Sequence, residues 1–172
     1  MNCKNEPIII RLAIPADAPD VAEIMMRSWE VAYKDIIPSD FIREKNATRP
    51  EQSRRVITED NATAYVIQRD GKTVGIMHVA SSEDEDVDES FHELHSIYLH
   101  PDCYRQGVGT QAMAFAFNIA RSLGKTTMIV WVLAKNTNTI KFYESCGFTA
   151  DGKTKIIKYG KALECIRMRR KL

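Results

Sequence analysis

The sequence predicts an α/β protein built on one mixed, mostly antiparallel sheet of six to seven strands, with helices on both faces. Asp70-Gly71 separates two strand-like runs and is typical of a hairpin turn, which pairs its strands antiparallel. Farther along, a strand, the helical pattern 108–123 and a second strand follow one another. That order predicts one central βαβ crossover, whose strands are parallel, so the sheet is expected to be mixed.

The elements of the first half follow from periodicity and turn residues. The apolar run Ile8–Ala13 predicts a strand, and the stretch Pro15–Asp20 offers capping chemistry for a following helix. Apolar side chains then recur at three- and four-residue steps from Val21 to Tyr33, which predicts that helix. A second helical segment is expected over Arg49–Thr58. The hairpin strands are expected over 64–68 and 73–80.

The second half contains the clearest helix and the most deeply buried strand. The helix over 108–123 is closed by Gly124, a residue favoured after helix ends. Thr127–Leu133 is almost continuously apolar, which is typical of a strand covered on both faces. The other expected elements are a strand over Glu93–Leu99, a turn over His100–Gln106, a short helix over Asn136–Ser145, and strands around Phe148–Gly152 and Leu163–Arg169.

Composition places the chain among globular proteins. Of its 172 residues, 44% are hydrophobic and 27% charged, which excludes disordered and collagen-like classes. With no repeat or linker, residues 1–172 are expected to form a single domain. No apolar run approaches the ~18 residues of a membrane span, and the polar start through Pro7 is unlike a signal peptide, so a cytoplasmic protein is expected. Four cysteines without a C-x-x-C pair are expected to be free thiols.

The formal net charge of +1 conceals an uneven distribution. Six of the seven residues from Glu83 to Glu89 are acidic, whereas Lys153–Leu172 is strongly basic. The acidic run is either a solvated loop or an attraction for a polycationic acceptor. The basic final strand alternates like an exposed sheet edge and has few aromatics, so no nucleic-acid partner is expected.

The stretch from His100 to Thr110 is the most informative, because it links a strand to a helix through two glycines. Gly107 and Gly109 let the backbone turn, and the first amides of the new helix have no partner within it. Such amides form a cradle for an anion, usually phosphate, and Arg105 lies beside them.

Two nucleotide-binding motifs are alternative interpretations of this cradle. Residues Gly107 to Ala112 satisfy G-x-G-x-x-A, but seven residues separate Leu99 from the first glycine, and the following strand has no Asp or Glu. Both features argue against a Rossmann site. A P-loop is excluded because no Gly-Lys-Ser/Thr follows, and a simple tight turn remains the plain alternative.

Two blocks of sequence resemble the GCN5-related N-acetyltransferases. Tyr104-Arg-Gln-Gly-Val-Gly109 is similar to that family's Q/R-x-x-G-x-G/A signature, with Tyr104 standing where Gln or Arg is usual. Asn136-Thr-Asn-Thr-Ile-Lys-Phe-Tyr-Glu-Ser-Cys-Gly-Phe148 is similar to the family's N-x-x-A-I-x-F-Y-x-x-x-G-F segment. The two blocks stand in the family's order and distance, and the resemblance extends to the whole order of elements.

The resemblance implies a GNAT-like fold and acetyl transfer from acetyl-CoA, as cosubstrate, to a primary amine. It also implies that the strand 97–99 runs beside the pantetheine arm, in a splayed gap next to strand 127–133. The coenzyme-binding residues implied in this way are Ile97, Tyr98, Leu99, Tyr104, Arg105, Gln106, Gly107, Val108, Gly109, Thr110, Asn136 and Phe142. Asn136 has a simpler role open to it, as the cap of its helix.

Transfer to an amine needs a base for the ammonium proton and an acid for the departing thiolate. By the resemblance, Tyr143 is the expected acid, with core packing as the alternative role. Glu93 is the expected base, directly or through water, and a surface carboxylate is its alternative. His95 is a rival base, which shares a face with Glu93 if the strand alternates regularly. His92, His95 and His100 fall on mixed faces of a strand, so no metal site is expected.

The identity of the acceptor amine is the least determined part of the expected function. A stripe of Trp29, Tyr33, Ile36 and Phe41 is either core or a wall of the acceptor site. A small-molecule amine, polyamine-like or amino-acid-like, is expected, and a peptide amine, at a protein amino terminus or lysine, is the alternative. A non-catalytic acyl-CoA sensor is the alternative from another class. No membrane partner is expected, and a homodimer is left open.

Overall fold

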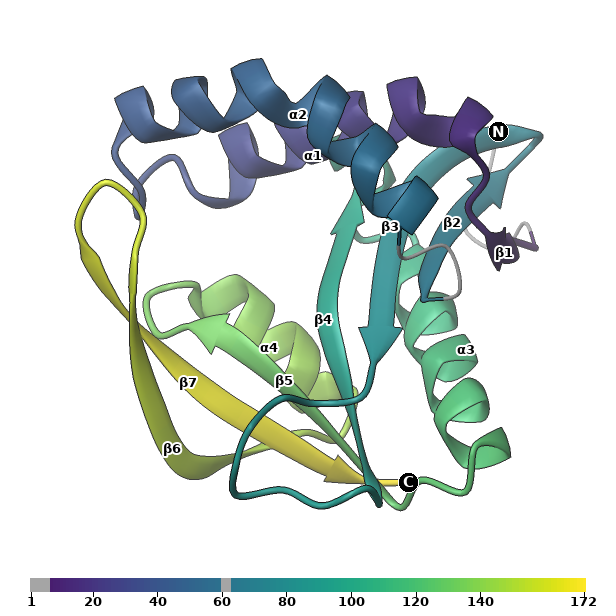
Figure 1. The fold of residues 1–172 in the computed structure, drawn as a ribbon, viewed down its shortest axis with the longest axis vertical. Helices are drawn as coiled ribbons and strands as arrows, with labels where there is room; N and C mark the ends of the chain where they lie inside the picture. The colour runs from purple at the N-terminus through teal and green to yellow at the C-terminus, as the bar shows by residue number, and fades with distance from the viewer. Residues whose placement is uncertain (1–6, 60–62) are drawn as a thin grey trace.

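The computed structural model describes residues 7–59 and 63–172, in which seven strands form one sheet in the order β1-β2-β3-β4-β5-β7-β6 (Figure 1). The strands are β1 (Ile9–Leu12), β2 (Ala64–Arg69), β3 (Lys72–Ala80), β4 (Phe91–Leu99), β5 (Thr127–Leu133), β6 (Thr149–Lys158) and β7 (Ala162–Lys171). The helices are α1 (Ala18–Ala32), α2 (Ser39–Glu59), α3 (Val108–Ser122) and α4 (Thr137–Ser145).

Strand pairing confirms the mixed sheet. Neighbouring strands are antiparallel except β4 and β5, which are parallel and are joined through α3. This is the single βαβ crossover that the order of elements predicts. The hairpin at Asp70-Gly71 also forms, and both of its turn residues have positive φ.

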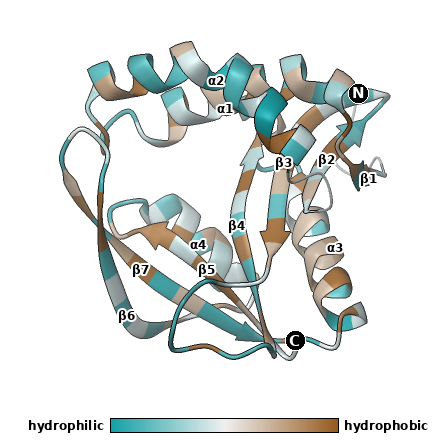
Figure 2. Cartoon of the chain, viewed as in Figure 1, coloured by the Kyte–Doolittle hydropathy of each residue, from teal (hydrophilic) through white to brown (hydrophobic). Residues whose placement is uncertain are grey.

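Helices cover both faces of the sheet. On one face α3 and α4 pack on the strands, with Met113, Phe117 and Tyr143 in the same buried cluster as Met77 and Leu94. On the other face α1 and α2 cover the strands through two smaller buried clusters. Figure 2 shows hydrophobic residues along the central strands and on α3, whereas α2 is largely hydrophilic, consistent with its exposed outer side.

Strands β4 and β5 pair over only three residues each. Residues 91–93 of β4 are in register with 127–129 of β5, and no pairing continues beyond Glu93 and Ile129. In Figure 1 the two strands meet near the lower end of the sheet and diverge above it. The splayed gap expected from the resemblance is therefore present, and its vertex lies at Glu93.

A β-bulge interrupts β4 immediately beyond this vertex. Val79 of β3 pairs with Leu94 and His78 pairs with Ser96, which leaves His95 as the extra residue. Side chains in β4 therefore do not alternate regularly, because a bulge places two residues opposite one.

Two sequence expectations are corrected. The second helix begins at Ser39 rather than near Arg49 and continues past Pro50, because Ile42 and Ile57 are buried in the clusters beneath it. The basic strand β7 is not a sheet edge, since it pairs with β5 on one side and with β6 on the other. The edge beside it is β6.

In the described part of the chain, no helix has the length and apolar character needed to cross a bilayer. Cys103, Cys146 and Cys165 are buried free thiols, as expected, whereas Cys3 lies outside the described residues. Burial raises the pKa of all three described thiols.

Asp17 joins the end of β1 to the start of α1. Its carboxylate is buried. It accepts two 2.8 Å hydrogen bonds from Arg11 and one from the backbone amide of Ile14. The pKa of Asp17 is lowered, and the hydrogen bonds from Arg11 are the largest cause. Burial opposes this effect, and the hydrogen bond from the Ile14 amide adds to it.

This pair predicts a pH-dependent contribution to stability. A carboxyl group whose pKa is lowered by folding stabilises the protein above its unfolded pKa, and that contribution is lost as pH falls through the folded pKa. Arg11→Gln should therefore lower the free energy of unfolding by about 1 kcal/mol at neutral pH, because Arg11 is partly exposed. The difference should shrink as pH falls below the ordinary carboxyl pKa and through the lowered pKa of folded Asp17. Urea denaturation at several pH values measures it.

Arg27→Gln is the matched control, because its ion pair with Glu30 is exposed at both ends. It should change the unfolding free energy by less than about 0.5 kcal/mol. Wild-type and Arg11→Gln curves that remain equally separated down to about pH 2 would contradict this account of Asp17.

Candidate active site

The glycine turn leaves a row of backbone amides without partners. After a 3₁₀ turn at Pro101–Cys103, Arg105 has φ +61° and Gly107, the N-cap of α3, has φ +80°. No side chain caps this helix. The amides of residues 106–110, which include Val108 and Thr110, donate no hydrogen bond to any described residue. This arrangement can hold an anion, as the glycine pattern predicts.

Side chains brace the turn. The hydroxyl of Tyr104 lies 3.2 Å from Ser28 Oγ on α1. Gln106 donates from its side chain to the Asp102 carbonyl and accepts a 2.7 Å hydrogen bond from Arg69. Because these two side chains bind the protein itself, the turn offers its backbone, together with the exposed Arg105, to a ligand.

Gly109 permits a close approach between α3 and α4. A Cβ atom there would lie 3.1 Å from the Phe142 ring and 3.6 Å from Leu99 Cδ1. A Cβ at this position would require the Phe142 ring to move by a few tenths of an ångström, so glycine favours the close packing. Gly107, in contrast, meets nothing within 4 Å and is required for its positive φ.

The edge of β4 that faces β5 is open beyond the vertex. The amide of His100 donates to Val74 of β3. Because successive amides of a strand point to opposite sides, those of Ile97 and Leu99 are directed toward β5, which does not pair with them. The side chains of Ile97 and Leu99 pack toward α3, whereas Tyr98 packs toward α1 and α2.

Glu93 lies at the vertex of the gap and is only 7% exposed. Its Oε2 accepts a 2.7 Å hydrogen bond from Ser82, and its Oε1 lies 3.4 Å from His95 Nδ1. The two rival bases are therefore in contact, although the strand does not alternate regularly. His95 also stacks on His78, with ring centroids 5.0 Å apart.

Tyr143 lies on α4 and is buried in the cluster that joins α3 and α4 to the sheet. It packs against Phe142 and Phe148, and none of the described side chains forms a hydrogen bond with its hydroxyl. Burial, reinforced by neighbouring Tyr98, raises the pKa of Tyr143 well above its usual value. Its phenol is therefore protonated throughout the neutral range. No hydrogen bond or ion pair joins it to Glu93 in the described structure.

The remaining candidates have structural contacts. Asn136 caps α4 by accepting from the Thr139 amide at 3.3 Å. The three histidines considered for metal binding lie in different surroundings: His92 is buried, His95 contacts Glu93, and His100 accepts from the Asp102 amide.

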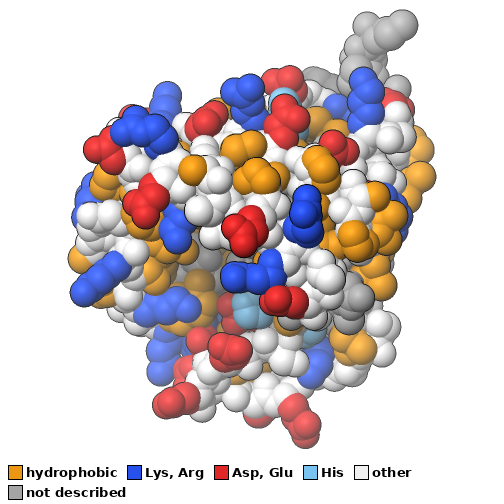
Figure 3. Space-filling model, turned by 45° about the horizontal axis from the view of Figure 1, so that its top comes forward, with side chains coloured by type: hydrophobic (Ala, Val, Ile, Leu, Met, Phe, Trp, Pro, Cys, Tyr) orange, Lys and Arg blue, Asp and Glu red, His pale blue; other side chains and the backbone are white. Residues whose placement is uncertain are grey.

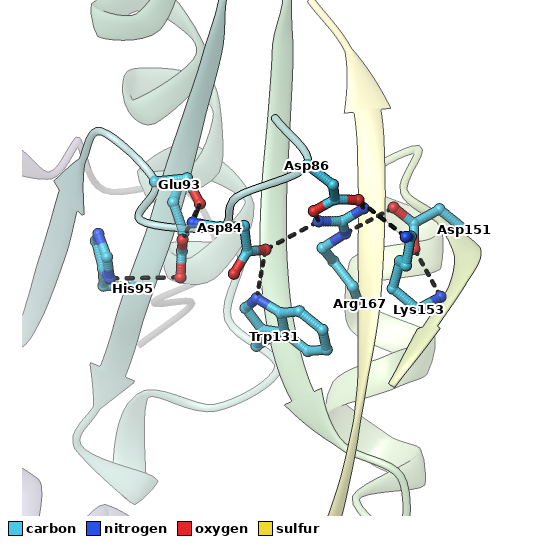
Figure 4. Close-up of polar contacts among 9 residues, drawn as sticks. Asp84, Asp86, Glu93, His95, Trp131, Asp151, Lys153 and Arg167 are labelled. Carbon is cyan, nitrogen blue, oxygen red and sulfur yellow. Dashed lines mark hydrogen bonds and ion pairs between the residues drawn. The ribbon is translucent and has the colours of Figure 1, made fainter. Parts of the chain in front are cut away.

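The acidic run is not a simple solvated loop. Asp84 and Asp86 fold back on Arg167 of β7, which also binds Asp151 of β6 (Figure 4). Asp84 accepts from Trp131 as well, and Lys153 pairs with Asp86. The hydrogen bonds that Arg167 donates to Asp86 are the largest cause both of the lowered pKa of Asp86 and of the raised pKa of Arg167.

We call residues 82–86 the acidic strap. Ser82 connects it to the vertex, since its hydroxyl donates to Glu93 and accepts from the Asp84 amide. Glu83, Glu85, Asp88 and Glu89 remain exposed. Figure 3 shows acidic side chains at the lower end of the molecule, where the β3–β4 loop lies in Figure 1.

Sequence reasoning missed Ser82, Arg167 and Arg49. Arg49 is buried on α2 with its guanidinium 4.3 Å over the Trp29 ring. Trp29 and Ile36 are buried and Tyr33 and Phe41 half-buried, which favours the core interpretation of that stripe. No sequence signal distinguishes a buried arginine from its exposed neighbours, because charged residues on helices are usually solvated.

Comparison with known proteins identifies relatives over most of the chain. The family model described as Acetyltransferase (GNAT) family matches residues 19–148. The uncharacterized N-acetyltransferase YuaI of Bacillus subtilis (strain 168) is 29% identical and aligns with 80% of this chain and 78% of its own length. The L-amino acid N-acyltransferase MnaT of Escherichia coli (strain K12) is 28% identical over 41% of this chain and 42% of its own.

A solved structure agrees with the fold. The paia N-acetyltransferase of Thermoplasma acidophilum, in complex with coenzyme A, has a TM-score of 0.75 and 19% identity, and the match covers 96% of this chain and 99% of that one. At this identity the likeness concerns the fold.

The acidic strap predicts a specific response to loss of Arg167. Arg167→Met should leave Asp84, Asp86 and Asp151 close together with Lys153 as their remaining cation, and lower the free energy of unfolding by about 3 kcal/mol. It should also speed cleavage of the native protein by a glutamate-specific protease between residues 83 and 89. Arg169→Met, exposed on the same strand, is the control and should do neither. If the protease cleaved both variants at the same rate, the role given to Arg167 would be contradicted.

Proposed function

Because this chain belongs to the Acetyltransferase (GNAT) family, we propose that it transfers an acetyl group from acetyl-CoA to the primary amine of a small molecule. The observation that carries the proposal is the row of unbonded amides at 106–110 beside the opening between β4 and β5. Relatives named as acting on L-amino acids, and on L-methionine sulfoximine and sulfone in Salmonella typhimurium (strain LT2), support a small acceptor.

The residues present fit acetyl-CoA. Amides 106–110 suit its pyrophosphate, because none of them is bonded within the described chain. The outward amides of Ile97 and Leu99 suit the amide groups of a pantetheine arm lying in the gap. Bound acetyl-CoA would supply the thioester whose acetyl group is transferred.

Glu93 would accept the proton of the incoming ammonium, directly or through water. An amine with a pKa near ~10 is almost fully protonated at neutral pH and cannot attack until it loses that proton. The carboxylate lies at the vertex, held by Ser82, and His95 at 3.4 Å offers a route for the proton toward solvent. The backbone amide of Leu99, which is directed toward the gap, would stabilise negative charge on the carbonyl oxygen, whereas that of Tyr98 is directed toward β3.

Tyr143 would donate a proton to the departing sulfur. Its phenol remains protonated at neutral pH because of burial, and none of the described groups accepts its hydrogen. The hydroxyl is therefore available to a ligand in the gap.

Incubation with acetyl-CoA and panels of amines and peptides tests the activity through release of free thiol. We expect small amines to release it. Tyr143→Phe should lower kcat about 100-fold or more while KM for acetyl-CoA stays within about threefold. The fold should be preserved, because the lost hydroxyl has no partner among the described residues. Phe115→Leu, half-buried on α3, is a control for altered packing. A chain that binds acetyl-CoA but acetylates nothing would instead be a sensor.

Glu93→Gln should lower the rate mainly at low pH. Below pH 7 we expect a loss of about 100-fold, which shrinks toward pH 9.5, because free amine then forms without help from the protein. The measurement is kcat/KM against pH. Glu89→Gln removes an exposed carboxylate of the same loop and should leave the profile unchanged. A Glu93→Gln profile parallel to that of the wild type would exclude Glu93 as the base.

A further inference from the structure

Arg49 is a buried cation without a counter-ion. It is 6% exposed, and none of the ion pairs found in residues 7–59 and 63–172 includes it. Leaving a charge buried and unpaired costs several kcal/mol, so such residues are rare unless they are paired or serve a ligand. Arg167, equally buried, has three carboxylate partners.

The Arg49 and Trp29 side chains, which are in contact, have N–H donors without acceptors. Nε and Nη2 of Arg49 and Nε1 of Trp29 are buried and have no hydrogen-bond partner in the described structure. Nη1 has only a long, 3.5 Å contact with Gln52. Because Nε and Nη2 form one edge of the guanidinium, the two free donors match the two oxygens of a carboxylate.

Aromatic residues enclose this pair of side chains. Trp29 lies edge-on to Tyr33, with ring centroids 5.1 Å apart, and 5.6 Å from Tyr159 of the β6–β7 turn. The side chain of Tyr98, on the β4 segment beside the gap, packs in the same cluster. Through Tyr98, the cluster around Trp29 and Arg49 therefore extends to the β4 segment beside the gap.

The charges in this region disfavour a polycationic acceptor. A cation entering beside Trp29 would meet the Arg49 guanidinium, which already covers the indole ring. In the acidic run, Asp84 and Asp86 are bound to Arg167, so only its other four carboxylates, which are exposed, are free to attract one.

We propose that the Nε–Nη2 edge of Arg49 binds a carboxylate of the acceptor, which makes the acceptor an amino acid or a similar carboxylate-bearing amine. This inference rests on the proposed acetyltransferase function, whose substrate class it specifies. The carboxylate would supply the acceptor atoms that these donors lack, and the amine of the same molecule would extend toward Tyr98 and the gap.

The test compares L-α-amino acids with their own α-amides as acceptors. Each pair differs only in the carboxylate, and the less basic amine of the amide biases the comparison against the proposal. For the best pair, wild-type kcat/KM should favour the acid by about tenfold or more. Arg49→Met should lower kcat/KM for the acid by about 10- to 100-fold, mainly through KM, and change that for the amide less than about threefold.

Two further variants separate binding from structure. Arg49→Lys keeps the charge over Trp29 but loses the paired donors, so it should recover only part of the acid preference. Arg54→Met removes an exposed arginine from the same helix and should behave as wild type. KM for acetyl-CoA should be unchanged in all three variants.

Distinct results would overturn the inference and the function. Equal wild-type turnover of acids and amides, or an Arg49→Met loss that is the same for both, would overturn the role of Arg49 and leave the acetyltransferase intact. Failure of every amine and peptide to release thiol would overturn the function itself. If Arg49→Met does not fold, inhibition of the wild type decides: N-acetyl-L-amino acids should compete with the acceptor, their amides should not, and equal inhibition would overturn the proposal.

Discussion

The parting of β4 and β5 is the constraint on which the rest of the site depends. Three residues of each strand pair, and beyond Glu93 and Ile129 the strands separate. Because the strands are parallel, the crossover helix α3 must begin at the open end, and its unbonded amides therefore face the gap. The bulge at His95 lies at the same point and keeps a second titratable side chain against Glu93.

Arg167 and Arg49 are both buried, but they differ in how their charge is compensated. Arg167 is neutralised by three carboxylates, which tie the acidic strap and the β6–β7 hairpin together and hold Ser82 on Glu93. Arg49 is covered by Trp29 and meets no carboxylate of the described chain. The first arrangement joins the acidic strap to β6 and β7, whereas the second leaves the cost of burying the charge without compensation in the described chain.

The type and order of the elements could be predicted because each has a local signal. The step of apolar residues predicts α1, Asp70-Gly71 predicts the β2–β3 turn, and the continuous apolar run predicts β5. The start of α2 could not be predicted, because the helix is largely polar. It continues through Pro50 because Ile42 and Ile57 pack against other elements. The position of β7 inside the sheet depends on pairing with β5, a partner distant in sequence.

For the candidate site, the sequence alone determined the residues of the glycine turn and the α4 segment, because backbone conformation and helix capping are written in a few adjacent residues. Only the tertiary structure decided which charges are satisfied. Asp84 binds Arg167, and the Arg49 guanidinium lies over Trp29 instead of in solvent. Both contacts join residues that are far apart in the chain. The electrostatic free energy of a charge is set by what packs around it, and that packing exists only once the chain has folded.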